Sequence, residues 1–366
     1  MFKKTQSAEQ AYSWGQYPRV SQTFHDQAWR CDSLPTTSKT MLPIGQNRSY
    51  GDSCLNHEGM VISSRFLNHF IDFDPHQGML TCEAGVTLER ILQLIVPCGW
   101  FLPVVPGTQF ASVGGAIAND VHGKNHHTQG NFGHHILGLE LLKSDGTRLW
   151  CNRETQSALF YATIGGLGLT GFITYATIQL KPIRSAFMQM RTIQYGHVDE
   201  FIELNHALSS QYEYTVAWVD SLATGKKLGQ GHFIVGDHAS IPEPPKVGNL
   251  KLAVPFAFPG DALNSLTVKM FNFAYYHRKG TRKDQSQLVH YRPFFFPLDA
   301  IARWNKIYGR EGFLQYQCVI PKDAILLKEI LRTVSESESG SFLTVLKEFG
   351  DLPSQGIMSF PMGGYT

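Results

Sequence analysis

Three glycine-bearing segments have the composition of loops that hold an anionic ligand through their backbone. They are residues 43–52 (P-I-G-Q-N-R-S-Y-G-D), 112–119 (S-V-G-G-A-I-A-N) and 165–171 (G-G-L-G-L-T-G), and each lies beside an expected strand. Glycine has no Cβ, so the main chain can approach an anion, and successive N–H groups form a concave site for phosphate oxygens. Tight turns alone would explain any one segment, but three together favour a diphosphate ligand.

None of the three segments is a G-x-G-x-x-G turn that follows a strand and precedes a ribose-binding acid, and none is a P-loop. Nicotinamide cofactors and nucleoside triphosphates are therefore not favoured.

Five of the 15 histidines fall within residues 122–135, in H-G-K-N-H-H and G-N-F-G-H-H. His122 and His126 have the i,i+4 spacing of zinc ligands on a helix. Gly123 and Asn125 are poor helix residues, however, and no H-E-x-x-H glutamate accompanies them. We favour a ligand pocket in which His122 and Lys124 bind substrate or stabilise negative charge. A third interpretation is that these side chains only satisfy loop backbone groups.

Short strands and helices must position these residues. Apolar positions in residues 88–95 predict a helix, capped by Thr87 and stopped at residues 97–99. Strands are expected at 60–62, 70–73, 79–84, 136–142, 148–151 and 172–180, with turns at 74–78 and 144–147 and a helix at 156–162. Strands and helices do not alternate regularly as βαβ units, so an α+β fold is expected. Composition changes near Pro182, which we take as the boundary between domains 1–182 and 183–366.

The bulk composition describes a globular protein of about two domains. Its 366 residues carry 32 basic and 30 acidic side chains, so nucleic acid is not an expected partner. Six scattered cysteines and a polar N-terminus without a secretory signal indicate a cytoplasmic protein with reduced thiols. No apolar run reaches the roughly 18 residues of a membrane span. Residues 252–273 are apolar and flanked by basic side chains, which suggests peripheral membrane contact.

Four motifs together resemble the FAD-binding (PCMH-type) domain of the vanillyl-alcohol oxidase superfamily. They are residues 43–52, V-P-G-T at 105–108, S-V-G-G-A-I-A-N-D-V-H-G-K-N-H-H at 112–127, and residues 165–173. Within the superfamily, the resemblance is closest to the flavoprotein oxidase subunits of decaprenylphosphoryl-ribose 2′-epimerases. F-L-Q-Y-Q-C-V-I-P at 313–321 and S-F-L-T-V-L-K-E-F-G at 341–350 are similar to the α+β substrate domain of that group. The resemblance begins near Lys39 and covers nearly all of the remaining chain.

The resemblance implies FAD as the cofactor. Arg48 occupies the place of the histidine that attaches FAD in many members, so a non-covalent complex is expected. The residues expected to wrap the diphosphate are Gly45, Gln46, Asn47, Arg48, Ser49, Tyr50 and Gly51, with Ser112, Gly114, Gly115 and Asn119 completing the cradle. Gly107 and Thr108 would lie near the isoalloxazine, and the residues near adenine and ribose would be Gly166, Gly171 and Ile173.

The resemblance also implies a substrate and the residues that face it. The substrate would be a polyprenylphosphoryl-ribose, whose 2′-hydroxyl is oxidised by hydride transfer to the flavin. The residues expected to face flavin and sugar phosphate are Tyr50, His122, Lys124, Gln315, Gln317 and Lys347, with Trp218 and Phe349 on an apolar wall. A short-chain NADH-dependent reductase is the implied partner. The sequence stops at residues 363–366 inside an expected strand, so we expect a substrate domain truncated at its C-terminus.

Two alternatives stay open at this point. An aldonolactone or alditol oxidase of the same superfamily would act on a soluble polyol. A histidine-rich metal-dependent hydrolase, or a binding module without catalysis, would belong to another class and would carry no flavin.

Overall fold

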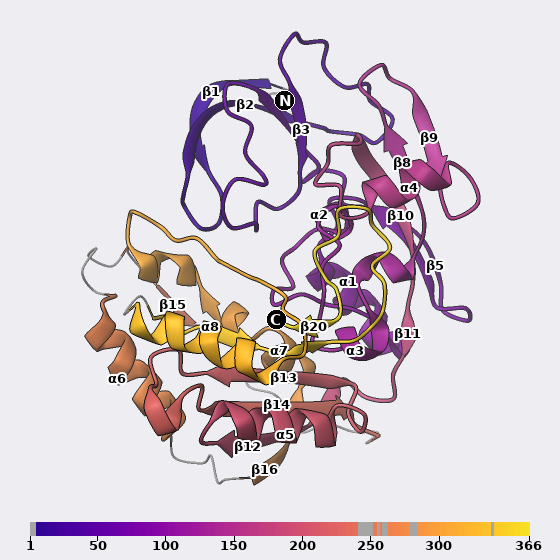
Figure 1. Cartoon of the computed structure of the whole chain (residues 1–366). Helices are drawn as coiled ribbons and strands as arrows, with labels where there is room; N and C mark the ends of the chain where they lie inside the picture. The colour runs from indigo at the N-terminus through magenta and orange to yellow at the C-terminus, as the bar shows by residue number, and fades with distance from the viewer. Residues whose placement is uncertain (1–4, 241–251, 255–256, 258–262, 279–283, 338–339) are drawn as a thin grey trace.

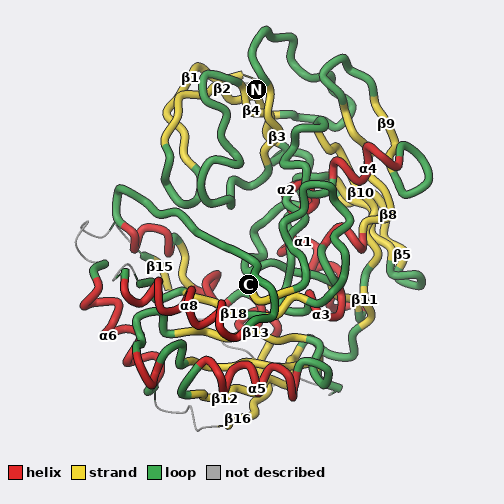
Figure 2. The backbone as a smooth tube through the Cα atoms, viewed as in Figure 1, coloured by secondary structure: helices red, strands yellow, loops and turns green. Residues whose placement is uncertain are grey.

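The computed structural model describes residues 5–240, 252–254, 257, 263–278, 284–337 and 340–366. Helices and strands alternate irregularly along the chain and gather in two parts, one above the other in Figure 1. Figure 2 shows that long loops connect the short elements of both parts. The expected α+β class is confirmed.

A four-stranded sheet opens the upper part. Its order is β1-β2-β4-β3, with the pair β1/β2 antiparallel and the other two pairs parallel. The strands are β1 (Thr5–Tyr12), β2 (Arg19–Asp26), β3 (Met41–Ile44) and β4 (Met60–Ser63). The first glycine segment begins on β3 and continues from its carboxyl end.

A five-stranded antiparallel sheet of order β5-β6-β10-β8-β9 forms the rest of the upper part. Its strands are β5 (Phe70–Asp74), β6 (Met79–Glu83), β8 (Ile136–Leu142), β9 (Arg148–Cys151) and β10 (Phe172–Gln179). The accompanying helices are α1 (Leu88–Ile95), α2 (Val113–Ala118), α3 (His126–Gln129), α4 (Ser157–Thr163), η1 (Val96–Cys98) and η2 (Phe132–His135).

Local sequence patterns predict this part well. The side chain of Thr87 accepts a hydrogen bond from the Arg90 amide, and Gly99 ends η1 in the left-handed conformation. Both predicted hairpins, β5–β6 and β8–β9, are present. The predicted helix at 156–162 is shifted by one residue, to α4.

A second five-stranded antiparallel sheet, of order β16-β12-β14-β13-β18, forms the lower part. Its strands are β12 (Phe187–Tyr195), β13 (Tyr214–Val219), β14 (Gly231–His238), β16 (Asp284–His290) and β18 (Thr344–Leu346). Helices α5 (Val198–Leu208) and α8 (Ala324–Glu336) cover one face, where Phe201 and Leu327 enter a separate apolar core.

The other face of this sheet joins the upper part through one continuous apolar core. That core contains Phe101 and Ile117 from the upper part together with Tyr214, Tyr291 and Phe295 from the lower part. The Phe101 and Phe295 rings lie 5.3 Å apart. Helix α7 (Tyr291–Phe295) supplies Tyr291, Phe294 and Phe295 to this core. The two halves are therefore packed directly on each other through these side chains.

Short elements complete the connections. The two-stranded pairs are β7 (Trp100–Phe101) with β11 (Lys181–Pro182), β15 (Leu252–Ala253) with β17 (Ile301–Ala302), and β19 (Glu348–Phe349) with β20 (Gly364–Tyr365). The remaining helices are α6 (Ser265–Tyr276), η3 (Gly225–Lys227), η5 (Pro297–Ala300) and η6 (Trp304–Tyr308). Between β19 and β20 the chain rises beside α2 and returns to the lower part (Figure 1).

The apolar segment predicted at residues 252–273 is described only in part. Residues 255–256 and 258–262 of this segment lie outside the described residues, whereas β15 and α6 lie within them. The longest described helix is α8 with 13 residues, and the described helices are all too short or too polar to cross a bilayer.

Asp120 holds the histidine-rich segment against the returning C-terminal segment. Its fully buried carboxylate accepts hydrogen bonds from the Gly133 amide at 2.8 Å, from Asn131 Nδ2 at 2.9 Å and from the Ser359 hydroxyl. A buried acceptor with three donors stabilises a fold because each donor would otherwise lose its hydrogen bond with water.

We predict that Asp120→Ala lowers the free energy of unfolding by about 3 kcal/mol, because it leaves buried donors unpaired. Ser359→Ala removes one of the three bonds, and we expect it to cost about 1 kcal/mol. Urea unfolding of the two variants measures both values. Equal losses would show that the Asp120 carboxylate does not act as a shared anchor.

Candidate active site

The first two glycine segments meet at Gly45. A Cβ built on Gly45 would overlap the Ser112 hydroxyl, so only glycine permits this approach. Ser112 is the N-cap of α2 and accepts a hydrogen bond from the Gly115 amide at 3.3 Å. A Cβ on Gly168 would lie 3.3 Å from Pro43, which places the third segment against the first.

The third segment is also bonded to the second. The amides of Gly165 and Leu167 donate to the carbonyls of Ile117 and Ala118, at 2.9 and 2.8 Å. These carbonyls belong to the last turn of α2. All three glycine segments, of which the first and third lie more than a hundred residues apart in sequence, therefore converge on one place.

The first segment is fixed by its own polar groups. Gln46 donates to the Gly85 carbonyl at 3.1 Å, and Asn47 donates to the Tyr12 carbonyl at 2.9 Å. Asn47 and Gly51 have left-handed backbone conformations, with φ of 53° and 75°. The Ser49 carbonyl accepts from the Trp14 amide at 3.1 Å. The loop is therefore shaped by contacts within the upper part.

Arg48 has an unusual environment for a guanidinium group. It lies 4.2 Å from the centre of the Trp14 ring and 5.1 Å from that of Phe110. Its Nε is buried and has no hydrogen-bond partner among the residues that the structure describes. Burial lowers the pKa of Arg48, and the nearby Asp299 carboxylate partly offsets that effect.

Asp299 was not singled out from the sequence, yet it joins the two halves at the site. Its carboxylate accepts hydrogen bonds from the Thr108 hydroxyl and the Gln109 amide, each at 2.8 Å. Burial raises the pKa of Asp299, whereas these two bonds lower it. An acid directly after the apolar residues 293–298 was the available signal, because a carboxylate buried beside such a run must find donors.

Tyr50 lies in an aromatic cluster with residues of the lower part. Its ring centre is 5.1 Å from that of Phe313 and 6.1 Å from that of Trp304. Burial, with smaller effects of Tyr308 and Asp299, raises the pKa of Tyr50 to about 12. The hydroxyl is therefore protonated at neutral pH.

His122 lies at the centre of a polar cluster built from distant segments. Its Nδ1 is 3.0 Å from Lys347 Nζ, and its Nε2 is 3.2 Å from Gln317 Nε2. Gln317 is also 3.2 Å from the Thr366 hydroxyl. The His122 ring packs at 4.8 Å against Phe349. Three of the residues predicted to face the substrate thus form one hydrogen-bonded group.

The charges of this cluster are weakened by burial. Burial, together with the neighbouring Lys347 and His126, lowers the pKa of His122 well below its usual value. Burial and the like charge of Lys124 lower the pKa of Lys347 to about 7. Burial alone lowers the pKa of Lys124 to about 8. Among the described residues, no carboxylate is paired with either lysine, so the site would favour an anionic ligand.

Lys124 and the neighbouring histidine are placed differently from Lys347. Lys124 donates to the Phe294 carbonyl and lies 4.8 Å from the centre of the Phe294 ring. His126 is buried and packs at 4.3 Å against Phe349. His126 begins α3, whereas His122 precedes it, so the two histidines do not share a helix. Among the described residues, no group of three or more His, Cys, Asp or Glu side chains could hold a metal ion.

Comparison with known proteins agrees with these features. Residues 33–152 match the family described as FAD binding domain. The chain is 37% identical over 334 residues to decaprenylphosphoryl-beta-D-ribose oxidase of Mycolicibacterium smegmatis, covering 88% of this chain and 72% of that protein. It is 32% identical over 298 residues to an uncharacterized Streptomyces coelicolor protein, covering 76% and 79%. A 26% identity over 148 residues relates it to D-arabinono-1,4-lactone oxidase of Yarrowia lipolytica, covering 39% and 28%.

The chain belongs to this family of FAD-dependent oxidoreductases. The expected superfamily, its cofactor and its enzyme class are thereby confirmed, and the hydrolase and binding-module alternatives are wrong.

The residues of this oxidoreductase fit FAD. A Cβ on Gly107 would have no atom within 4 Å, so a ring could approach that backbone, and the unpaired Arg48 Nε offers a buried donor nearby. In contrast, Gly166 sits so close to the Ala162 carbonyl that a side chain would not fit. Close contacts at glycine residues shape the three loops. Gly107, which has open space beside its Cα, lies instead in the V-P-G-T motif at residues 105–108.

The remaining predicted cofactor residues of the oxidoreductase occupy mixed environments. Gly114 packs on Ala84, while Asn119 ends α2 and donates to the Gly115 carbonyl at 2.8 Å. Gly171 has a φ of 147°, and Ile173 follows it as a buried residue of β10. Their assignment to FAD stays a prediction.

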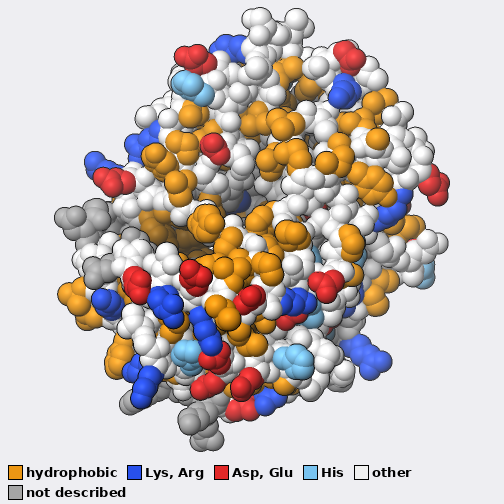
Figure 3. Space-filling model, in the orientation of Figure 1, with side chains coloured by type: hydrophobic (Ala, Val, Ile, Leu, Met, Phe, Trp, Pro, Cys, Tyr) orange, Lys and Arg blue, Asp and Glu red, His pale blue; other side chains and the backbone are white. Residues whose placement is uncertain are grey.

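Trp218 and Gln315 are not bonded to the His122 cluster. Trp218 lies on β13, donates to the Phe342 carbonyl at 3.0 Å and packs at 4.6 Å against Tyr275 of α6. Gln315 is exposed in the loop that also carries Gln317. Figure 3 shows a hollow on this face of the oxidoreductase, rimmed by hydrophobic side chains, between the β1–β2 region and the lower part.

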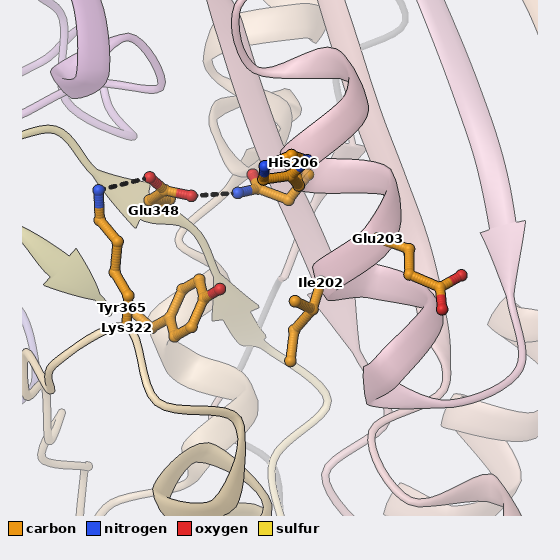
Figure 4. Close-up of a pocket in the computed structure, with 7 residues that line it drawn as sticks. Ile202, Glu203, His206, Lys322, Glu348 and Tyr365 are labelled. Atoms are coloured by element: carbon orange, nitrogen blue, oxygen red, sulfur yellow. Dashed lines mark hydrogen bonds and ion pairs between the residues drawn. The ribbon is translucent and has the colours of Figure 1, made fainter.

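Strand β19 and the preceding residue Lys347 face the site on one side and an open cavity on the other. Lys347 and Phe349 contact His122, whereas Glu348 between them contacts Lys322 at 2.8 Å and Asn205 on the other side (Figure 4). Glu348 lines a cavity of about 610 Å³ together with residues of α5. The ion pair therefore anchors the segment that presents Lys347.

We predict that Gly45→Ala lowers the free energy of unfolding by about 1–3 kcal/mol, because its methyl group would collide with Ser112. Gly107→Ala is the matched control, because open space surrounds it, and we expect it to leave stability unchanged. Adding Ser112→Ala to Gly45→Ala should restore part of the loss. Thermal unfolding of the cofactor-free protein checks all three variants, and equal melting temperatures would contradict the close contact.

We also predict that an inorganic anion binds less tightly as pH rises. Lys347 has a pKa of about 7, and only its protonated form attracts an anion. The dissociation constant for pyrophosphate should therefore rise between pH 7 and 9, by up to about tenfold per unit. Lys347→Met should bind more weakly at pH 6.5 and show a shallower rise. Titration calorimetry checks this, and parallel pH profiles would contradict the assignment.

Proposed function

We propose that this oxidoreductase oxidises the 2′-hydroxyl of a polyprenylphosphoryl-ribose to the 2′-keto sugar, an intermediate of arabinose-donor synthesis. The identity to decaprenylphosphoryl-beta-D-ribose oxidase, which extends over 88% of this chain, carries the proposal. The two lysines with lowered pKa support it, because a sugar phosphate would supply the negative charge that the cluster lacks.

The two halves of the sequence would bind different ligands. Residues 1–182 would hold FAD, with Gly45 to Gly51 and Ser112 to Asn119 as the cradle and Thr108 beside the ring. Residues 183–366 would bind the substrate, with Trp218 and Phe349 as apolar wall. We propose a non-covalent complex, because Arg48, whose guanidinium contacts the Trp14 and Phe110 rings, stands in the place of the attaching histidine.

When bound, FAD supplies a hydride acceptor. The chain itself must then hold the sugar and take up the hydroxyl proton. Burial holds the pKa of His122 well below its usual value, so the ring is neutral, and a neutral imidazole accepts a hydrogen bond at one nitrogen only. Its two contacts are both satisfied if Lys347 donates to Nδ1 and the Gln317 amide is turned so that its oxygen accepts from Nε2.

This arrangement gives Lys347 and His122 complementary roles. The His122 ring is oriented from both sides, so its position against Phe349 is fixed before substrate arrives. Lys347 changes protonation near neutral pH and could exchange a proton with the substrate through this group. Lys124 and Tyr50 would line the same space, with Gln315 at its exposed edge.

We propose two further partners. The polyprenyl tail keeps the substrate in a membrane, so the protein would contact a membrane surface. The 2′-keto sugar must be reduced to complete an epimerisation, and a short-chain NADH-dependent reductase would supply that step.

A visible spectrum tests the cofactor proposal. We expect the purified protein to be yellow and to release all of its flavin colour into the supernatant after acid precipitation. Colour retained in the pellet would show a covalent bond between FAD and the protein.

Product analysis tests the identity of the substrate. A keto sugar on a polyprenyl phosphate is expected, whereas hydrogen peroxide formed only from a soluble polyol would favour an aldonolactone or alditol oxidase.

A further inference from the structure

Helix α6 is apolar on two opposite faces. Its inner face carries Tyr275, whose ring packs at 4.6 Å against Trp218, and Phe271, whose ring packs at 5.4 Å against Phe342. Val268 on the same side is buried. These contacts fix the helix on the lower part, beside the predicted substrate wall.

The outer face carries three large apolar side chains that the described residues leave exposed. Leu266, Met270 and Phe273 follow the i, i+4, i+7 spacing of one stripe, and 66%, 64% and 64% of their surfaces are exposed. Lys269 flanks the stripe, and α6 contains no acidic residue. A helix covered by protein on one side needs no apolar stripe on the other, so this stripe requires a partner.

We propose that the outer face of α6 docks on a lipid membrane with anionic headgroups. The inference rests on the proposed function, because a polyprenyl-phosphate substrate resides in such a membrane. The three apolar side chains would enter the boundary between headgroups and acyl chains, and Lys269 would lie among lipid phosphates.

A second copy of the chain fits this surface less well than a membrane does. A standard protein interface buries about 800 Å² on each partner, well beyond what one stripe of three side chains offers.

Docking through α6 would also bring a membrane-bound substrate close to the predicted substrate wall. Figure 1 places α6 at the same side of the molecule as the hollow of Figure 3, and the inner face of α6 contacts Trp218. A lipid tail could therefore pass from the membrane to the site along the helix.

Co-sedimentation of the full chain with lipid vesicles tests the proposal. We expect binding to vesicles of phosphatidylglycerol and phosphatidylcholine, and much weaker binding to phosphatidylcholine alone. The double variant Leu266→Gln with Phe273→Gln should lose at least about tenfold in partitioning. Lys269→Glu should lose about fivefold on the anionic vesicles only. Ile325→Gln on α8, where 78% of the side chain is exposed, is the matched control and should bind like the parent.

Three results would overturn the docking surface: no binding of the parent to anionic vesicles, equal binding of the double variant, or equal losses in the Ile325→Gln control. A dimer of the parent that the double variant loses in sedimentation velocity would assign the stripe to a second copy instead. Oxidation of a short-chain, water-soluble prenylphosphoryl-ribose separates the two proposals. If the parent binds vesicles as expected but never oxidises this compound, the proposed function fails and the docking surface stands.

Discussion

The close approach of Gly45 to Ser112 is the constraint on which the remaining geometry depends. Because no side chain separates them, β3 and α2 lie in direct contact, and the third glycine segment can bond to the end of α2. Helix α2 leads directly into the histidine-rich segment, so its position also decides where His122 lies. This one backbone contact thus determines the positions of both the glycine loops, which could hold a dinucleotide, and the polar cluster around His122, which could bind a substrate.

The electrostatics of the cluster follow from where the positive charges are buried. Lys124 and Lys347 reach the site from different halves. Burial lowers the pKa of each amine, the like charge of Lys124 adds to the effect on Lys347, and no carboxylate among the described residues is paired with either lysine to offset it. This is a destabilising arrangement for a protein alone, because charged amines lose hydration without gaining a counter-ion. Folding stability should therefore gain from these lysines as pH rises above 7 and they become neutral. The same arrangement favours an anion at neutral pH, which makes the destabilising burial useful for binding.

The sequence predicted those parts of the molecule that local patterns determine. Thr87 and the apolar spacing of residues 88–95 specify α1, and the glycine turns at 78 and 146 specify two hairpins, because these signals act within a few residues. The grouping of His122 with Lys347 and Gln317 came from a resemblance, since nothing local to residue 122 indicates a partner 225 positions away. Asp299 was missed for the same reason, because its donors lie on Thr108 and Gln109 in the other half. The zinc-like spacing of His122 and His126 was not favoured from the sequence, because Gly123 and Asn125 are poor helix residues, and α3 starts only at His126.

Residues 347–349, which end in strand β19, connect the site to the part of the fold behind it. Alternation along an extended backbone sends Lys347 and Phe349 toward His122 and Glu348 toward Lys322 and α5. Lys322 and Asn205 fix the carboxylate of Glu348, and the backbone it belongs to can then shift little. An amine with a pKa near 7 is sensitive to small changes in its distance from neighbouring charges. The ion pair on the far face would therefore help to set the protonation of Lys347, although it touches neither His122 nor any predicted ligand.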